Sequence, residues 1–168
     1  MHETKEDHAS YTTLTMVRQF DVKPERLFDA WINPQMMRKW LMTMEATNKV
    51  ATCDPRVGGT WEIVDVRDGV EYRAIGEYLE VDPPHKLVLT FRMPQFNDSV
   101  DTLTVKIKPL GKGCEMVFTQ VIRVPHEEGW REAEIARAMQ EYHDGSQHGW
   151  NLMFVGLQQL LKAQENEG

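Results

Sequence analysis

The strongest constraint on the fold is a helical apolar pattern near the end of the chain, in residues 146–161. Its large apolar residues recur at offsets of four, three and four positions, the spacing of one face of an α-helix. These residues are Trp150, Phe154, Leu157 and Leu161, and the face is widened by Met153 and Leu160. A helix with so wide an apolar face requires a large apolar partner surface. The strands predicted in the middle of the chain supply that surface.

Glycines interrupt this C-terminal region. Gly149 and Gly156 are seven residues apart and lie nearly one above the other, which predicts a close approach to a neighbouring backbone. The sequence Asp144-Gly145-Ser146 predicts a helix break, with Ser146 as the N-cap of the last helix. A separate helix is predicted before this break, over residues 128–142.

Several earlier segments alternate between apolar and polar residues, which predicts β-strands. Strands are expected at residues 12–20, 49–52, 60–67, 72–81, 87–93, 102–108 and 114–123. Two short helices are expected after the first strand, beginning near Pro24 and at Asn33-Pro34. Because hairpin-length turns join the later strands, the sheet should be antiparallel. Conflicting apolar parity within residues 72–81 predicts a β-bulge.

These elements predict one α+β domain over residues 11–165, after a disordered polar lead at residues 1–10. The length of 168 residues is that of a single domain. A formal net charge of -7 argues against nucleic-acid binding, and the chain has no apolar run of the ~18 residues that a membrane span needs. Two cysteines without motif spacing, and no signal-peptide pattern, predict a reduced cytoplasmic protein.

Four motifs, in order along the chain, resemble those of one family. They are residues 22–31 with Asn33-Pro34 and Trp40, the turn Asp54-Pro55-Arg56-Val57-Gly58-Gly59-Thr60-Trp61, residues 76–81 with Pro83-Pro84 and residues 87–90, and Gly149-Trp150 with Phe154 and Leu157. They are similar to motifs of proteins like the activator of heat-shock-protein-90 ATPase, within the SRPBCC or START-like superfamily. The resemblance runs in register over residues 12–161.

The resemblance implies a helix-grip fold, in which a curved antiparallel sheet wraps round the C-terminal helix and leaves a cavity between them. Members of the superfamily include ligand carriers, polyketide cyclases and aromatase-like proteins, resistance proteins and chaperone activators. The chaperone activator carries a separate N-terminal domain, whereas only residues 1–11 precede the first strand predicted here. A chaperone partner is therefore not expected.

The sequence contains no motif for a covalent nucleophile, a metal ion or a cofactor. None of its three serines lies in a G-x-S-x-G pattern. Cys53 and Cys114 fall in predicted strands, where a buried, unreactive thiol is typical. His143 and His148 are five residues apart and point about 140° apart on a helix, so they do not face one ion without a break.

Two residues are weak candidates for acid–base chemistry. Asp65 shares its parity with Trp61 and Ile63, so a carboxylate enters the cavity if that side of the strand faces inward. His148 lies next to Gly149-Trp150 and has access to the same space.

Aromatic and methionine residues form the strongest functional pattern. One set comes from elements that meet at the cavity of a helix-grip fold: Trp40, Trp61, Phe91, Met93, Phe96, Trp150 and Phe154. Each alone is typical of a filled core, but together they form an apolar wall of the kind that binds small molecules. We therefore predict a protein that binds a small hydrophobic or aromatic ligand without covalent catalysis.

Two other functions remain open from the sequence. One is an enzyme of cyclase or hydrolase type that uses Asp65 or His148 as acid or base. The other is a chaperone-binding module, which rests on the resemblance alone. Exposed apolar residues, such as Phe96 and Trp130, would mark a homodimer contact.

Overall fold

The computed structural model describes residues 8–167, with side chains described as far as residue 164. Its elements follow in the order β1 (Ala9–Phe20), α1 (Pro24–Ile32), α2 (Pro34–Trp40), β2 (Asn48–Cys53), β3 (Thr60–Arg67), β4 (Val70–Asp82), β5 (Lys86–Phe91), β6 (Asp101–Leu110), β7 (Gly113–Pro125) and α3 (Glu132–Glu167). The predicted α+β helix-grip fold is confirmed. Of the predicted disordered lead, residues 1–7 lie outside the described part, and Ala9 and Ser10 begin β1.

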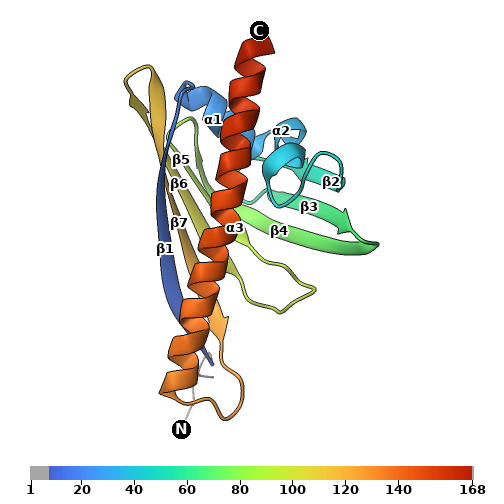
Figure 1. The fold of residues 1–168 in the computed structure, drawn as a ribbon, viewed down its shortest axis with the longest axis vertical. Helices are drawn as coiled ribbons and strands as arrows, with labels where there is room; N and C mark the ends of the chain where they lie inside the picture. Colours follow the sequence, from blue (N-terminus) through green and yellow to red (C-terminus); the bar gives the residue numbers. More distant parts are fainter. Residues whose placement is uncertain (1–7, 168) are drawn as a thin grey trace.

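The seven strands form an open sheet in the order β1-β7-β6-β5-β4-β3-β2. Every neighbouring pair is antiparallel, as the short connections predicted. Asp68 and Gly69 join β3 to β4 with φ angles of 53° and 78°, which are conformations of the tight hairpin turn that this dipeptide favours. The sheet bends around α3, and β1 and β2 form its two edges (Figure 1).

Prolines begin both short helices at the predicted places. Pro24 and Pro34 stand in the first turn of α1 and α2, where a missing backbone N–H costs no hydrogen bond. Asn33 ends α1 and caps α2, since its side-chain oxygen accepts a hydrogen bond of 3.0 Å from the second backbone N–H of α2. α1 also contacts the end of α3, where the Arg26 guanidinium donates to the Leu161 carbonyl oxygen at 3.2 Å.

α3 lies lengthwise across one face of the sheet and packs on β1 and β7 (Figure 1). Its buried face is the predicted one. At most 3% of the surface is exposed at Trp150, Phe154, Leu157 and Leu161. The apolar pattern near the end of the chain therefore identifies the helix that closes the core.

The predicted break at Asp144-Gly145-Ser146 is wrong, because α3 is one helix of 36 residues and Ser146 lies inside it. Of the separate helix predicted at residues 128–142, residues 132–142 form the first part of α3, and residues 128–131 precede it. Ala138 is 6% exposed and Met139 packs against the core, so the inward face continues on both sides of Gly145. A glycine costs a helix only about 1 kcal/mol, which is less than this packing contributes.

The prediction that Gly149 and Gly156 allow a neighbouring backbone to approach α3 closely is wrong. A Cβ added at Gly145, Gly149 or Gly156 would meet no atom within 4 Å. Replacing each by alanine should therefore stabilise the protein by about 1 kcal/mol, because alanine favours a helix by that amount. Urea denaturation of the single and triple variants measures the gain. A loss of stability at any of the three would show a backbone contact that the structure lacks.

The predicted β-bulge in β4 is confirmed by a register shift against β5. Near it, Trp61 Nε1 donates to the Thr90 carbonyl oxygen at 3.1 Å, and the backbone N–H of Glu77 donates to the Thr90 hydroxyl at 2.9 Å. Side chains thus supply hydrogen bonds where the regular ladder is interrupted. The Trp61 indole lies against Gly76, which has no side chain to exclude it.

Candidate functional site

A hollow of about 130 Å³ lies where the connection between β5 and β6, the end of β7 and α3 meet. It is lined by Phe91, Arg92, Met93, Phe96, Asn97, Ser99, Asp101, Arg123 and Tyr142. The structure thus brings together three of the predicted ligand-binding residues, Phe91, Met93 and Phe96. We call this space the Asp101 hollow.

Asp101 reaches the hollow because of the alternation along β6. It pairs in register with Phe91 of β5. The residues that follow it at intervals of two are all buried: Leu103, Val105 and Ile107. Successive side chains of a strand point to opposite faces, so Asp101 shares the inward face with these three.

A chain of hydrogen bonds, buried at its Trp150 end, connects the hollow to the space beneath α3. Asp101 Oδ2 accepts from Gln120 Nε2 at 2.9 Å, and Gln120 Oε1 accepts from Trp150 Nε1 at 2.9 Å. Asp101 Oδ1 accepts from the backbone N–H of Arg123 at 2.9 Å. Burial raises the pKa of the Asp101 carboxyl above its usual value, and the hydrogen bonds from Arg123 and Gln120 partly oppose this. The hollow therefore contains a carboxyl group whose orientation is fixed from two sides.

Two guanidinium groups also belong to the lining. Arg123 donates to the Ser99 hydroxyl at 2.8 Å. Arg92 Nε is buried and has no hydrogen-bond partner among the described residues. The hollow thus combines apolar walls with the Asp101 carboxyl group and the Ser99 hydroxyl that Arg123 contacts.

Trp40, Trp150 and Phe154, three more predicted residues, lie in the core instead. They surround Trp31, whose ring centroid is 4.8 Å from that of Trp40 and 6.0 Å from that of Trp150. Phe118 packs on the same cluster, 4.5 Å from Trp150. Each of these five side chains is at most 3% exposed, so the rings fill the space between α1, α3 and the sheet.

Trp61, the seventh predicted residue, is 2% exposed and stacks on Phe91, with 6.3 Å between the ring centroids. It therefore stands behind one wall of the hollow. Phe96, by contrast, is 63% exposed and leans on Tyr72 at 6.4 Å.

Comparison with known proteins decides the family. Residues 21–162 match the family model described as Activator of Hsp90 ATPase homolog 1-like protein. The chain belongs to this family. No curated protein matches the chain.

Solved structures of several bacterial proteins have the same fold as this chain. A protein of unknown function from Staphylococcus aureus is 25% identical with a TM-score of 0.88, over 94% of this chain and 98% of that one. Proteins from Rhizobium loti and Chromobacterium violaceum are 23% and 22% identical, with TM-scores of 0.69 and 0.68. They cover 89% and 88% of this chain, and 96% and 95% of their own. At that identity they show the fold alone.

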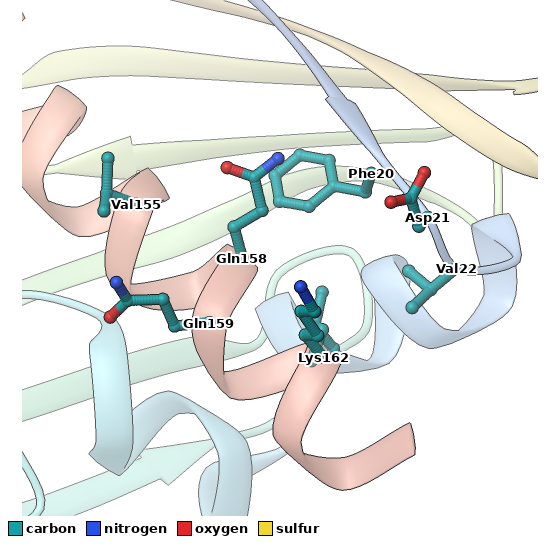
Figure 2. A pocket seen from close by; sticks show the side chains of 8 residues that line it. Phe20, Asp21, Val22, Val155, Gln158, Gln159 and Lys162 are labelled. Carbon is teal, nitrogen blue, oxygen red and sulfur yellow. The ribbon is translucent and has the colours of Figure 1, made fainter. Parts of the chain in front are cut away.

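The protein has a second hollow, of about 390 Å³, between the end of β1, the connection from β1 to α1, and α3 (Figure 2). Phe20, Val22 and Leu161 form its apolar floor. Figure 2 shows Gln158 projecting from α3 toward Phe20. Asp21 and Lys162 are the charged groups of its lining and both are exposed. Both hollows are partly open to the surface, and the Asp101 hollow differs in adjoining the hydrogen-bonded side chains of Asp101 and Gln120.

Asp65 faces inward, as its parity predicted, and is 3% exposed. Its Oδ1 accepts from the Thr43 and Thr47 hydroxyls at 2.8 and 2.5 Å, and its Oδ2 is 2.8 Å from Arg67 Nε. These contacts fasten the loop after α2 to β3, which accounts for a buried carboxylate without a catalytic role. The acid–base role of Asp65 stays a prediction.

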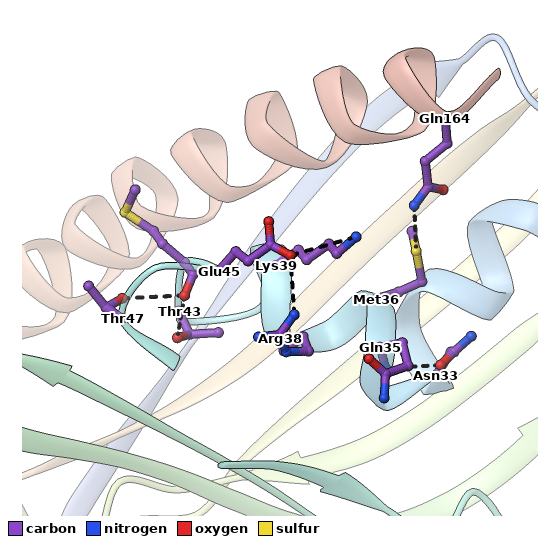
Figure 3. A network of polar contacts seen from close by, with 10 residues as sticks. Asn33, Gln35, Met36, Arg38, Lys39, Thr43, Glu45, Thr47 and Gln164 are labelled. Carbon is purple, nitrogen blue, oxygen red and sulfur yellow. Dashed lines mark hydrogen bonds and ion pairs between the residues drawn. The ribbon is translucent and has the colours of Figure 1, made fainter. Parts of the chain in front are cut away.

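Charged side chains at the surface of the same loop add little to this attachment. Glu45 lies 3.1 Å from Arg38 and 3.8 Å from Lys39 (Figure 3). The Glu45 side chain is 60% exposed, and ion pairs in such positions contribute at most about 1 kcal/mol. Asp65 with its two threonines is therefore the principal polar anchor of the loop.

Two further residues singled out from the sequence are His148 and Trp130. His148, the second acid–base candidate, is exposed on α3, and its role stays a prediction. Trp130 is not the exposed residue that the sequence predicted, because it is partly buried against the core. The described residues contain no group of three or more side chains able to hold a metal ion. No helix within the described part is long and apolar enough to cross a membrane.

Sequence reasoning missed Asp101 and Gln120, although a signal for both was present. Each is a polar residue at an inward position of an otherwise apolar alternation, Asp101 before Leu103 and Gln120 between Phe118 and Ile122. A polar residue at such a position requires a buried partner. In this protein the two are partners of each other.

Proposed function

We propose that the protein binds one small apolar molecule non-covalently in the Asp101 hollow. The observation that carries this proposal is the composition of the lining: Phe91, Met93, Phe96 and Tyr142 stand beside the half-buried carboxyl group of Asp101 and the buried Ser99. Ligand sites combine apolar walls with a few polar groups that fix orientation. The fold of this family often encloses small hydrophobic ligands, which also supports the proposal.

The size of the hollow indicates a ligand with a single ring or a short chain. Its volume is about 130 Å³, and an apolar cavity of about 150 Å³ is known to hold benzene. Phe96 stands on the connection between β5 and β6 and is largely exposed. A change in its position would admit a longer molecule without disturbing the sheet.

The state of the cysteines agrees with binding rather than covalent chemistry. Burial raises the pKa of Cys53, and it raises that of Cys114 to about 11. Both side chains are therefore neutral thiols near pH 7, and a thiol is a much weaker nucleophile than a thiolate. Within the hollow, the Ser99 hydroxyl accepts from Arg123, and no histidine stands among the lining residues.

Native mass spectrometry of freshly purified protein, compared with the denatured protein, tests the proposal. A small mass that is released on unfolding is the expected result. A melting-temperature screen with single-ring and short-chain compounds extends the test to ligands lost in purification, since a bound ligand stabilises the folded state. The proposal fails if no mass is released and no compound raises the melting temperature.

Phe96→Ala should weaken binding of the compound so identified by about tenfold, the equivalent of about 1.4 kcal/mol, because it removes one wall of the hollow. Leu152→Ala is the matched control, since Leu152 is 59% exposed on α3 and Phe96 is 63% exposed. Calorimetric titration measures both dissociation constants. Equal affinities of the two variants would place the ligand outside the Asp101 hollow.

A further inference from the structure

The Asp101 carboxyl group accepts about half of the hydrogen bonds that a carboxylate is able to accept. Oδ2 accepts one from Gln120 and Oδ1 accepts one from the backbone N–H of Arg123, whereas the two oxygens of a carboxylate offer about four lone-pair positions. No other donor among the described residues reaches either oxygen. The side chain is half-buried and lines the hollow, so its remaining lone pairs are suited to a donor on the ligand.

The Ser99 hydroxyl is the second polar group of the hollow. Its oxygen accepts from Arg123 Nη1 at 2.8 Å, and its own hydrogen has no acceptor among the residues that the structure describes. Ser99 is 8% exposed and belongs to the same lining as Asp101. A hydroxyl both donates and accepts, and its hydrogen rotates toward an available acceptor. The hollow therefore offers an acceptor at Asp101 and a donor at Ser99.

The charged groups of the hollow favour a neutral ligand. Phe91 pairs in register with Asp101 and lines the hollow, so the side chain of the next residue, Arg92, points to the opposite face of the sheet. On that face Arg92 lines a separate hollow of about 420 Å³. The Asp101 hollow is left with one carboxyl group and the guanidinium group of Arg123. A cation would be repelled by Arg123 and an anion by Asp101.

We propose that the ligand is a neutral molecule with a hydroxyl group, such as a single-ring phenol, whose O–H donates to Asp101 while its apolar part lies against Phe91, Met93 and Phe96. This inference rests on the proposed function, because it concerns the ligand of the same hollow. A hydroxyl oxygen also accepts a hydrogen bond of the kind that Ser99 donates, whereas an ammonium group only donates and a carboxylate only accepts. Hydrogen bonds to a charged acceptor are stronger than those between neutral groups.

Four single-ring probes separate the hydroxyl group from shape and charge: para-cresol, para-fluorotoluene, benzylamine and benzoate. Their affinities are measured by NMR titration of the isotope-labelled full chain. Para-fluorotoluene has nearly the shape of para-cresol but no O–H donor. Para-cresol should therefore bind about tenfold more tightly than para-fluorotoluene, a difference of about 1.4 kcal/mol. Benzylamine and benzoate should both bind more weakly than para-cresol.

Asp101→Leu removes the proposed acceptor and keeps a side chain of similar size. It should reduce the affinity for para-cresol to that for para-fluorotoluene. Asp98→Leu is the matched control, because Asp98 is an exposed residue of the same connection and does not line the hollow. It should leave both affinities unchanged.

The outcomes separate this inference from the proposed function. Para-fluorotoluene that binds as tightly as para-cresol, with shifts at Phe91 and Met93, would overturn the hydroxyl group and retain the binding site. Tighter binding of benzylamine or benzoate than of para-cresol would do the same. If none of the four probes shifts the resonances of Phe91, Met93 or Asp101, both the inference and the binding site fail. The comparison of probes uses the unaltered chain, so it decides the inference even if Asp101→Leu does not fold.

Discussion

Gly76→Ala is expected to destabilise the protein by about 3 kcal/mol, the upper end of the usual range for an overpacked interior position. An alanine Cβ would lie 1.8 Å from the Thr90 carbonyl oxygen and 2.4 Å from Trp61 Nε1. The carbonyl belongs to the backbone of β5, so it does not rotate away as a side chain would. Moving Trp61 would break its 3.1 Å hydrogen bond to that same carbonyl. Urea denaturation measures the change in the free energy of unfolding.

Gly149→Ala makes the same chemical change where the added methyl group meets nothing within 4 Å. It should stabilise the protein by about 1 kcal/mol, so the two variants are expected to differ in sign. A loss below about 1 kcal/mol for Gly76→Ala, which is the average for any substitution, would mean that the β4–β5 junction relaxes. In that case the hydrogen bond between Trp61 and Thr90 does not fix the geometry of the β4–β5 junction.

The sequence predicted the sheet well, because alternation and turn chemistry act locally. The strand predicted at residues 60–67 is β3 as observed, Thr60–Arg67, since Gly58-Gly59 and Asp68-Gly69 limit it on both sides. The bulge in β4 was also predictable, because two apolar parities compete along that strand and both cannot face inward without one.

The continuity of α3 could not be read from local signals. Asp144, Gly145 and Ser146 are residues of a helix start, yet they lie inside a helix whose buried residues occur on both sides of them, at Ala138 and Trp150. Tertiary packing outweighs a local preference of about 1 kcal/mol. The packing of the helix on the core on both sides of Gly145 decides the outcome.

The sequence predicted which side chains face inward but not which of them leave space. Trp40, Trp150 and Phe154 pack with Trp31 and leave none, while Phe91 and Met93 border the Asp101 hollow. The difference depends on the placement of neighbouring rings, which periodicity does not contain. The polar residues Asp101 and Gln120 identify the hollow better than the aromatic residues do, because a carboxyl group at an inward position requires hydrogen-bond partners beside it.

Gln120→Met is the second change with a large expected effect, a loss of about 3 kcal/mol in the free energy of unfolding. Methionine has a similar size and shape, so the cavity left behind is small. The change removes the partner of the Trp150 indole N–H and one partner of the Asp101 carboxyl. Each buried group left unsatisfied costs about 1–3 kcal/mol. Gln158→Met is the control, because Gln158 is exposed and its hydrogen bond to Gln19 lies at the surface.

Gln120→Glu separates the loss of the Trp150 hydrogen bond from the loss of the Asp101 hydrogen bond. The introduced carboxylate still accepts from Trp150, but it faces Asp101 across the position of a hydrogen bond that is now 2.9 Å long. Two carboxylates at that distance do not both ionise without a large cost, so one of them holds a proton in the folded protein. A pKa raised by folding means that stability is retained at low pH and falls as pH rises through the folded value. As pH rises above about 4, the usual pKa of a carboxyl group, the variant should therefore lose more stability than Gln120→Met. Parallel unfolding curves of the two variants over that range would show that Asp101 is not held against Gln120, and the chain from α3 to the hollow would then not exist in solution.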